Sequence, residues 1–189
     1  MPLFPTPGLT TRGAAAWALA GLLLACAPPR DRVSATLSGA AFRTQLVGPA
    51  QASTCRARGV LVLQGSEGDD GLALVWFYGD SLRADSVPLG PPIWHRADAA
   101  DSERSIASGA YRRTTATDVL GYQSRNGWMR ITPGTDGDVS ATFGAVFDRT
   151  GAAESLWVAG RFDRLRPVED PTLCTVPRAA RDTGVTLAP

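Results

Sequence analysis

The sequence predicts an all-β fold, an antiparallel β-sandwich or small barrel of about eight or nine strands, after an N-terminal signal helix. Three features favour this class: short runs of alternating apolar residues, glycine-rich connections between them, and no helical period after residue 25. Many short strands at close spacing are typical of both architectures, and of the two we expect the sandwich first.

The first expected strand covers residues 33–42. Apolar and hydroxyl side chains alternate there, which is the two-residue period of a half-buried strand. Residues 43–47 are an expected extension beyond Gly39, and residues 48–58 are expected to be a loop held by Cys55.

Two continuous apolar runs follow at residues 59–64 and 72–78. Both are short and rich in β-branched or aromatic residues, which favours strands over helices. The glycine-rich residues 65–71 between them suit a hairpin. Because both runs are apolar throughout, we expect these strands at the centre of the core, covered on both faces.

The signal is weaker between residues 79 and 127. Three prolines interrupt any regular element and leave an expected edge strand at 93–95. Residues 98–108 are expected to be a loop, and residues 109–113 and 118–123 to be further strands.

The last expected strands are clearer, at residues 128–132, 139–147 and 156–162. The last two alternate apolar and other residues and indicate a long antiparallel hairpin. This alternation places Trp157 on the face opposite its apolar neighbours.

Residues 13–25 form a thirteen-residue segment without charge, preceded by Arg12. Such a segment matches the apolar part of a secretory signal peptide and is too short to span about 30 Å of hydrocarbon. Two prolines and three charged residues follow and stop a helix. We interpret residues 1–25 as a signal peptide and residues 26–32 as the start of the exported chain, with a flexible tether.

The stretch Leu23-Leu24-Ala25-Cys26 resembles the lipobox of bacterial lipoproteins. The resemblance covers residues 13–26 only. It implies that the Cys26 thiol receives diacylglycerol, that cleavage occurs before Cys26 and that the new amine can be acylated. Such lipid chains anchor a protein stably to a membrane. Ala27 at the next position implies the outer membrane if the cell has two membranes, and the cell membrane otherwise.

The chain has three cysteines, Cys26, Cys55 and Cys174. Lipidation of Cys26 leaves one pair, which is expected to oxidise outside the cytoplasm. We therefore predict a disulfide between Cys55 and Cys174, which would close a single β-domain over residues 33–174. A metal or redox pair is the alternative, but CxxC spacing and nearby histidines are missing. Residues 175–189 are an expected mobile tail.

Charge and length limit the possible functions. Removing 25 of 189 residues leaves 164, enough for one domain. The chain has 19 arginines and no lysine, and the 18 arginines after Arg12 balance 18 carboxylates. This balance excludes the basic footprint of a nucleic-acid-binding protein. Arg161, Arg164 and Arg166 lie beside acidic residues and are interpreted as a salt-bridged rim.

The sequence contains little catalytic chemistry. His95 is the only histidine, so a histidine-based metal cluster is excluded and any catalytic triad would depend on it. GxSxG, P-loop and GxGxxG motifs are missing. We therefore expect no catalytic residue, metal or cofactor. Two acidic groups could surround Ca²⁺ but lack EF-hand spacing, and turns favour such residues without a metal: Glu67, Asp69 and Asp70, and Asp136 and Asp138.

Aromatic residues are the remaining candidates for binding. If several point outward they could stack on sugars or peptides, although most aromatics of a small β-domain fill its core. These candidates are Trp76, Tyr78, Trp94, Tyr111, Tyr122, Trp128 and Trp157.

We therefore expect a non-enzymatic, lipid-anchored domain of the bacterial cell envelope, facing the periplasm or exterior, that binds a protein or carbohydrate partner or serves structurally. The alternatives are a tethered hydrolase using acidic residues and a barrel that carries a small apolar ligand. A deep pocket with two carboxylates would favour the hydrolase. An exposed aromatic strip would favour carbohydrate or peptide binding, and an enclosed dry cavity would favour the carrier.

Overall fold

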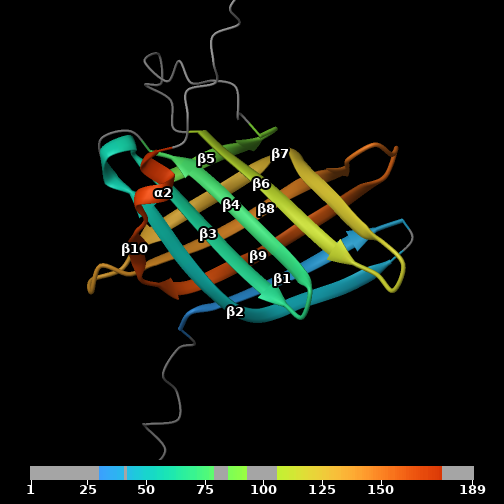
Figure 1. The fold of residues 1–189 in the computed structure, drawn as a ribbon, viewed down its shortest axis with the longest axis horizontal. Coiled ribbons are helices and arrows are strands. Elements are labelled where there is room, and N and C mark those ends of the chain that lie inside the picture. The colour runs from blue at the N-terminus through green and yellow to red at the C-terminus, as the bar shows by residue number, and fades with distance from the viewer. Residues whose placement is uncertain (1–29, 41, 79–84, 93–105, 176–189) are drawn as a thin grey trace, which may run out of the picture.

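The computed structural model describes residues 30–40, 42–78, 85–92 and 106–175. The all-β prediction is confirmed, because these residues form ten strands, a 3-10 turn at Arg56–Arg58 and the short helix α2 at Pro171–Cys174 (Figure 1). The strands are β1 (Arg32–Gly39), β2 (Arg43–Cys55), β3 (Val60–Glu67), β4 (Asp70–Phe77), β5 (Asp85–Gly90), β6 (Ile106–Thr114), β7 (Val119–Pro133), β8 (Val139–Arg149), β9 (Ser155–Leu165) and β10 (Pro167–Glu169).

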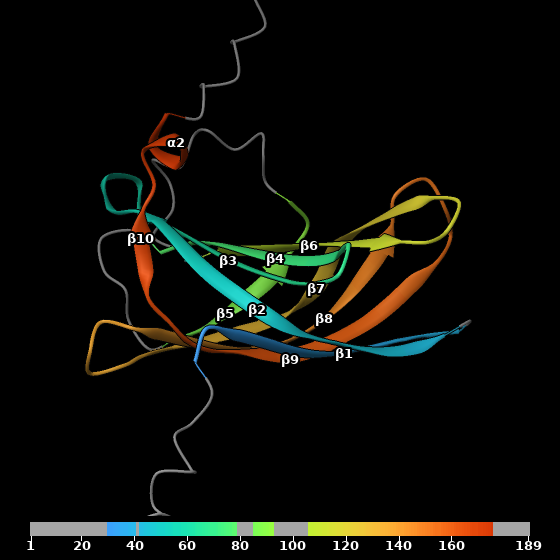
Figure 2. The same ribbon diagram turned by 60° about the horizontal axis from the view of Figure 1, so that its bottom comes forward.

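All ten strands belong to one sheet that closes on itself. β1 is hydrogen bonded to both β2 and β9, and β7 to both β6 and β8, so the long strands form a ring of antiparallel neighbours. The ring is flattened, with β3, β4 and β6 in one layer and β1, β8 and β9 in the other (Figure 2). It is not an even barrel, because the short strands β5 and β10 are inserted beside β6 and β2 in parallel pairing.

β2 replaces most of the loop that was expected over residues 48–58. Its first half pairs with β1 through Pro49, and its second half pairs with β3 from Ala50 onward. The strand thus crosses from one layer to the other. Gly48 lies at this crossing, where a Cβ would overlap the carbonyl oxygen of Ser66. Gly48 and Pro49 led to the prediction of a loop, because both residues usually interrupt a strand. Here both lie where β2 passes from pairing with β1 to pairing with β3.

β5 is a strand that the sequence did not predict, because its residues include Pro88. It pairs with β7 from Asp85 to Pro88 and then with β6 at Leu89 and Gly90. β5 therefore fills the gap where β6 and β7 separate. Val87 and Leu89 are buried in the core, which explains why this short strand is held there.

β7 is one long strand where two were expected, at 118–123 and 128–132. A bulge between Ser124 and Asn126 shifts its register on β8. Such a bulge adds a residue and reverses the alternation of faces, so a single period does not fit the whole strand.

The core fills the space between the two layers. Inward-facing residues of every long strand form one buried cluster, with Trp76, Tyr111, Tyr122, Phe143, Phe147 and Phe162 among its largest side chains. Burying one such side chain contributes about 1.5 to 3 kcal/mol. The expectation that both apolar strands are covered on both faces is confirmed for β3, because its outward residues Val60 and Val62 are buried as well. The outward residues of β4 are only partly buried: Ala73, Val75 and Phe77.

Some expected elements lie outside the described residues. These are the signal helix within 1–25, the edge strand at 93–95 and the tail after Thr175. Of the loop expected at 98–108, the last residues are described and begin β6, which corrects that boundary.

Candidate functional site

Three residues that the sequence analysis considered for lipidation, binding or catalysis lie outside the described residues: Cys26, Trp94 and His95. The remaining aromatic candidates divide between the core and the surface. Trp76, Tyr111 and Tyr122 are buried, and Tyr78 is partly buried against the core. Trp128 and Trp157 point outward from β7 and β9, as alternation predicted for Trp157, and expose 45% and 47% of their surface.

The two exposed tryptophans meet over Gly144 of β8, and we call Trp128, Gly144 and Trp157 the tryptophan face. Gly144 is the register partner of Trp128, and the neighbouring Val146 is the partner of Trp157. A Cβ on Gly144 would lie 3.2 Å from Trp128 Nε1 and 3.0 Å from Trp157 Cζ2. Gly144 is buried although it points outward. The edges of both indoles therefore converge over Gly144 and cover it.

A polar row lies next to the tryptophan face on the same surface. Arg130, Thr142 and Arg161 are register partners on β7, β8 and β9, two residues along each strand from the row of Trp128 and Gly144. All three are exposed. Arg161 Nε lies 3.1 Å from Asp163 Oδ2. Despite this contact, most of the Arg161 side chain is exposed to solvent. Apolar rings and hydrogen-bonding groups thus occupy adjacent rows on one face of the sheet.

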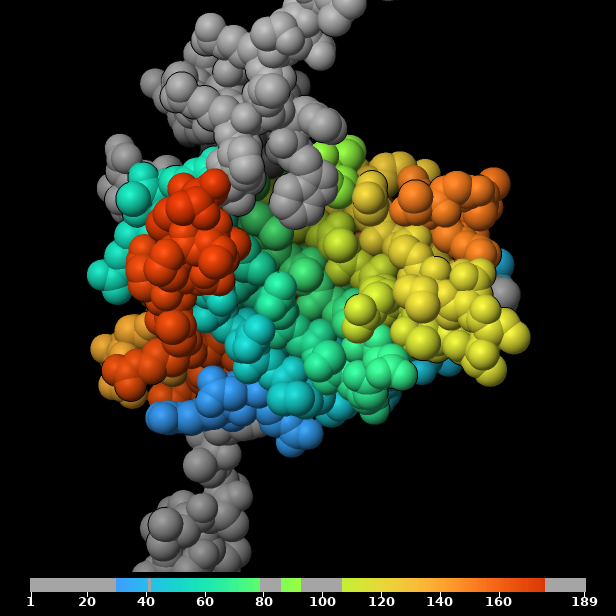
Figure 3. All heavy atoms as spheres, viewed as in Figure 1, coloured from blue at the N-terminus to red at the C-terminus, as the bar shows by residue number. Residues whose placement is uncertain are grey.

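A shallow groove of about 840 Å³ crosses the opposite layer, on the side that Figure 3 views. Its residues include one continuous row of register partners over five strands: Gln51, Gln64, Ala73, Ala110 and Gln123. The amides of Gln51 and Gln64 are hydrogen bonded at 3.0 Å. Small alanines form the floor and amides the two ends. None of the described lining residues is an aspartate, glutamate, histidine or cysteine.

Two buried tyrosines support the floor of this groove from inside. Tyr111 Oη donates a hydrogen bond to Asp70 Oδ2 at 3.0 Å, and Tyr122 Oη donates one to Glu154 Oε1 at 3.1 Å. Burial and the hydrogen bond to Asp70 raise the pKa of Tyr111 far above its ordinary value. Burial and the bond to Glu154 also raise the pKa of Tyr122. Both hydroxyls therefore serve as neutral donors rather than as bases.

Four of the five acidic residues considered for calcium, all except Asp69, are engaged with protein donors. Glu67 accepts the Val47 amide at 2.8 Å, and Asp70 accepts the Thr114 amide at 2.7 Å as well as the Tyr111 hydroxyl. Asp138 Oδ2 lies 2.8 Å from Arg164 Nε. These contacts give the carboxylates a role in joining strands.

The salt-bridged rim predicted for the three arginines is confirmed for two of them. Arg161 pairs with Asp163, and Arg164 pairs with Asp138 and, at 3.5 Å, with Asp136. Arg166 instead lines a second shallow hollow.

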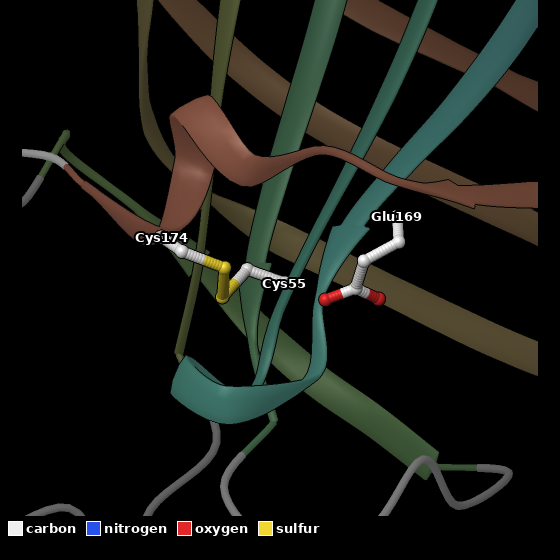
Figure 4. A group of neighbouring side chains, drawn as sticks. All are labelled: Cys55, Glu169 and Cys174. Carbon is white, nitrogen blue, oxygen red and sulfur yellow. A yellow bond between two sulfur atoms is a disulfide. The ribbon is translucent and has the colours of Figure 1, made fainter.

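Cys55 and Cys174 form a disulfide, as the cysteine count predicted. Figure 4 shows Glu169 beside it, and its carboxylate and the two sulfurs lie within 4.8 Å of one another. Metal binding by cysteine requires thiolates, and these sulfurs are bonded to each other. The Glu169 carboxylate accepts the Arg56 amide at 3.1 Å and lies near the Arg56 guanidinium. This corner therefore links β2 to the end of the domain.

Comparisons with family models, curated proteins and solved structures found no match to this chain. Within the residues that the structure describes, no helix is long and apolar enough to cross a membrane.

Sequence reasoning grouped Trp128 with the other aromatics and gave no role to Gly144. A signal was present for Trp128, because Met129 and Ile131 alternate with Trp128 and Arg130 and so place Trp128 outward. The meeting of Trp128 with Trp157 depends on pairing across three strands and has no local signal.

Proposed function

We propose that this chain is a lipid-anchored, exported domain of the bacterial cell envelope with a non-enzymatic binding role, and that the tryptophan face is its binding surface. One observation carries the binding role: two tryptophans share one surface and each exposes almost half of its area. Tryptophan is among the residues that contribute most to binding, because it removes a large apolar surface from water when covered.

The anchor rests on the resemblance of residues 23–26 to a lipobox. From Cys26 to the start of β1 at Arg32 the chain advances six residues, which reach at most about 20 Å when extended. A domain on such a tether stays next to the membrane surface. Its partner is then a component of the same envelope.

We place catalysis second because the larger groove has no carboxylate among its described lining residues. The second, shallow hollow includes Asp31, Glu169 and Asp170, but Glu169 and Asp170 accept hydrogen bonds from the Arg56 and Thr172 amides. A hydrolase using acidic residues needs two such groups facing one substrate. The carrier barrel is placed third because the described interior is occupied by the buried side chains of the core cluster.

The anchor is tested by intact mass and detergent partitioning of the membrane fraction, beside a Cys26→Ser variant. We expect the mass of residues 26–189 plus acyl chains, and loss of that species in the variant. An unmodified, water-soluble wild-type chain would refute the anchor.

The binding role is tested by sedimentation with envelopes of the producing cells, in detergent that keeps the lipid in micelles. We expect the wild-type chain to sediment and a Trp128→Ala/Trp157→Ala variant to stay in solution. Val168→Ala is the matched control, because Val168 is an exposed apolar residue on β10. Equal sedimentation of all three chains, or none by the wild type, would argue against this surface.

A further inference from the structure

We infer that the tryptophan face binds a glycan chain, with sugar rings stacked on the indoles of Trp128 and Trp157 and sugar oxygens bonded to the adjacent row of Arg130, Thr142 and Arg161. This inference rests on the proposed binding role and names the ligand class of the same surface.

Ring stacking is favoured by the way the two indoles lie. Gly144 is covered by their edges, and each tryptophan is close to half exposed, so both indoles offer apolar surface to solvent. Exposed indole surface fits the apolar C–H face of a pyranose ring, which has no side chain to insert into a pocket. The two indoles sit on β7 and β9, so neighbouring sugars of one chain can engage both.

The adjacent polar row fits the other half of a sugar. A pyranose has an apolar face and a rim of hydroxyl or carboxylate oxygens, so it needs aromatic and hydrogen-bonding groups side by side. The guanidiniums of Arg130 and Arg161 donate to either kind of oxygen, and Thr142 between them both donates and accepts. The surface supplies these two chemistries in neighbouring rows.

A stable protein partner fits this surface less well. Such interfaces use about 20 to 30 residues on each side around an apolar centre. Here the centre consists of two indoles, with the small or partly buried Val146 and Ala159 beside them. Exposed Arg130, Thr142 and Arg161 border it within one row, which limits the apolar area available to a second protein.

The experiment repeats the sedimentation assay with two preparations from the producing cells: untreated envelopes, and the insoluble glycan left after detergent extraction and proteinase digestion. The full chain is used with its anchor in micelles, and the proteinase is inactivated first. We expect the wild-type chain to bind both preparations. Trp157→Ala should lower retention on the glycan at least about tenfold, equivalent to 1.4 kcal/mol, and Trp157→Phe should restore part of it because the ring remains.

The outcomes separate the two proposals. Binding to the envelopes that disappears from the stripped glycan would overturn the glycan assignment in favour of a protein partner, while leaving the binding role intact. No tryptophan-dependent binding to either preparation would remove the proposed function itself. Val168→Ala controls for a general loss of surface hydrophobicity, and a denaturation curve for each variant establishes that it is folded.

Discussion

Tyr111 and Asp70 join the start of β4 to β6 by a hydrogen bond of 3.0 Å, with the tyrosine ring inside the core. Asp70 also accepts the Thr114 amide, so one carboxylate closes this end of the layer. Ionising Tyr111 would bury an anion beside another anion, and its pKa is therefore raised. The folded state holds this proton more tightly than the unfolded state does.

This relationship predicts how stability depends on alkaline pH. Because the folded pKa of Tyr111 is raised, its contribution is complete below the unfolded pKa of about 10 and is lost as pH rises above it. The decline approaches about 1.4 kcal/mol per pH unit for each tyrosine that ionises only when unfolded. The chain has no lysine to titrate in the same range. Guanidinium unfolding between pH 8 and 11.5 measures this decline.

Tyr111→Phe is the matched variant for this prediction. Because the hydrogen bond to Asp70 is lost, we expect its free energy of unfolding near pH 7 to fall by about 1.5 to 3 kcal/mol. Above pH 10 its free energy of unfolding should decline less steeply than that of the wild type. Tyr122→Phe should also reduce the slope, since the pKa of Tyr122 is raised by burial and Glu154. An unchanged alkaline slope in both variants would show that these tyrosines do not control it.

The sequence predicted the fold class because the alternation of apolar residues in β1, β8 and β9 reports which side of each strand meets the core. It missed β5 and divided β7, since a strand through Pro88 and a bulge at Ser124 and Asn126 depend on which strands lie alongside. Closure of the sheet likewise depends on β1 pairing with both β2 and β9, which no local pattern encodes.

The candidate site was predictable in part. Alternation placed Trp157 outward, and the cysteine count paired Cys55 with Cys174. The convergence of Trp157 with Trp128 over Gly144 was not predictable, because it joins residues on three strands through their register. Glycine within a strand indicates a close approach, but the sequence does not show by which group.

The second prediction concerns the disulfide between Cys55 and Cys174, which are 119 residues apart. Closing so long a loop restricts the unfolded chain, and the chain-entropy model gives about 4 to 5 kcal/mol, with measured values often lower. We expect reduction, or a Cys55→Ala/Cys174→Ala variant, to lower the free energy of unfolding by about 2 kcal/mol or more. Denaturant titration with and without reductant measures this change in the free energy of unfolding.

A loss below about 0.5 kcal/mol would mean that the cross-link contributes little. Non-reducing peptide mapping establishes the link itself.

The third prediction concerns Ser124, whose buried hydroxyl joins β5, β6 and β7. Its oxygen accepts the Gly109 amide at 2.7 Å and donates to the Gly90 carbonyl. Ser124→Ala leaves both backbone groups without this partner, at a cost of about 1 to 3 kcal/mol for each buried group. We expect a loss of about 2 kcal/mol or more in chemical denaturation.

Ser155→Ala is the control for Ser124, because Ser155 bonds Asp148 at 2.7 Å on the exposed surface. It should change stability by less than about 0.5 kcal/mol, as surface substitutions usually do. Equal losses in the two variants would show that the seam around β5 does not depend on the Ser124 hydroxyl.

The last prediction contrasts two strand glycines, Gly144 and Gly160. The three atoms nearest to a Cβ at Gly144 would all belong to the edges of the Trp128 and Trp157 rings, which can move into solvent. A Cβ at Gly160 would overlap backbone atoms of Ser34 and Ala35, so β1 and β9 would have to separate.

Gly144→Ala should therefore lift the indoles, shift tryptophan emission to longer wavelength and weaken envelope binding, while stability changes by less than about 1 kcal/mol. Gly160→Ala should cost about 1 to 3 kcal/mol or more through overpacking. Because Gly144 does not have a positive φ, its backbone conformation does not require glycine. Unchanged emission and binding in Gly144→Ala would mean that the indoles do not rest on this residue, and that the tryptophan face is not built as a flat surface.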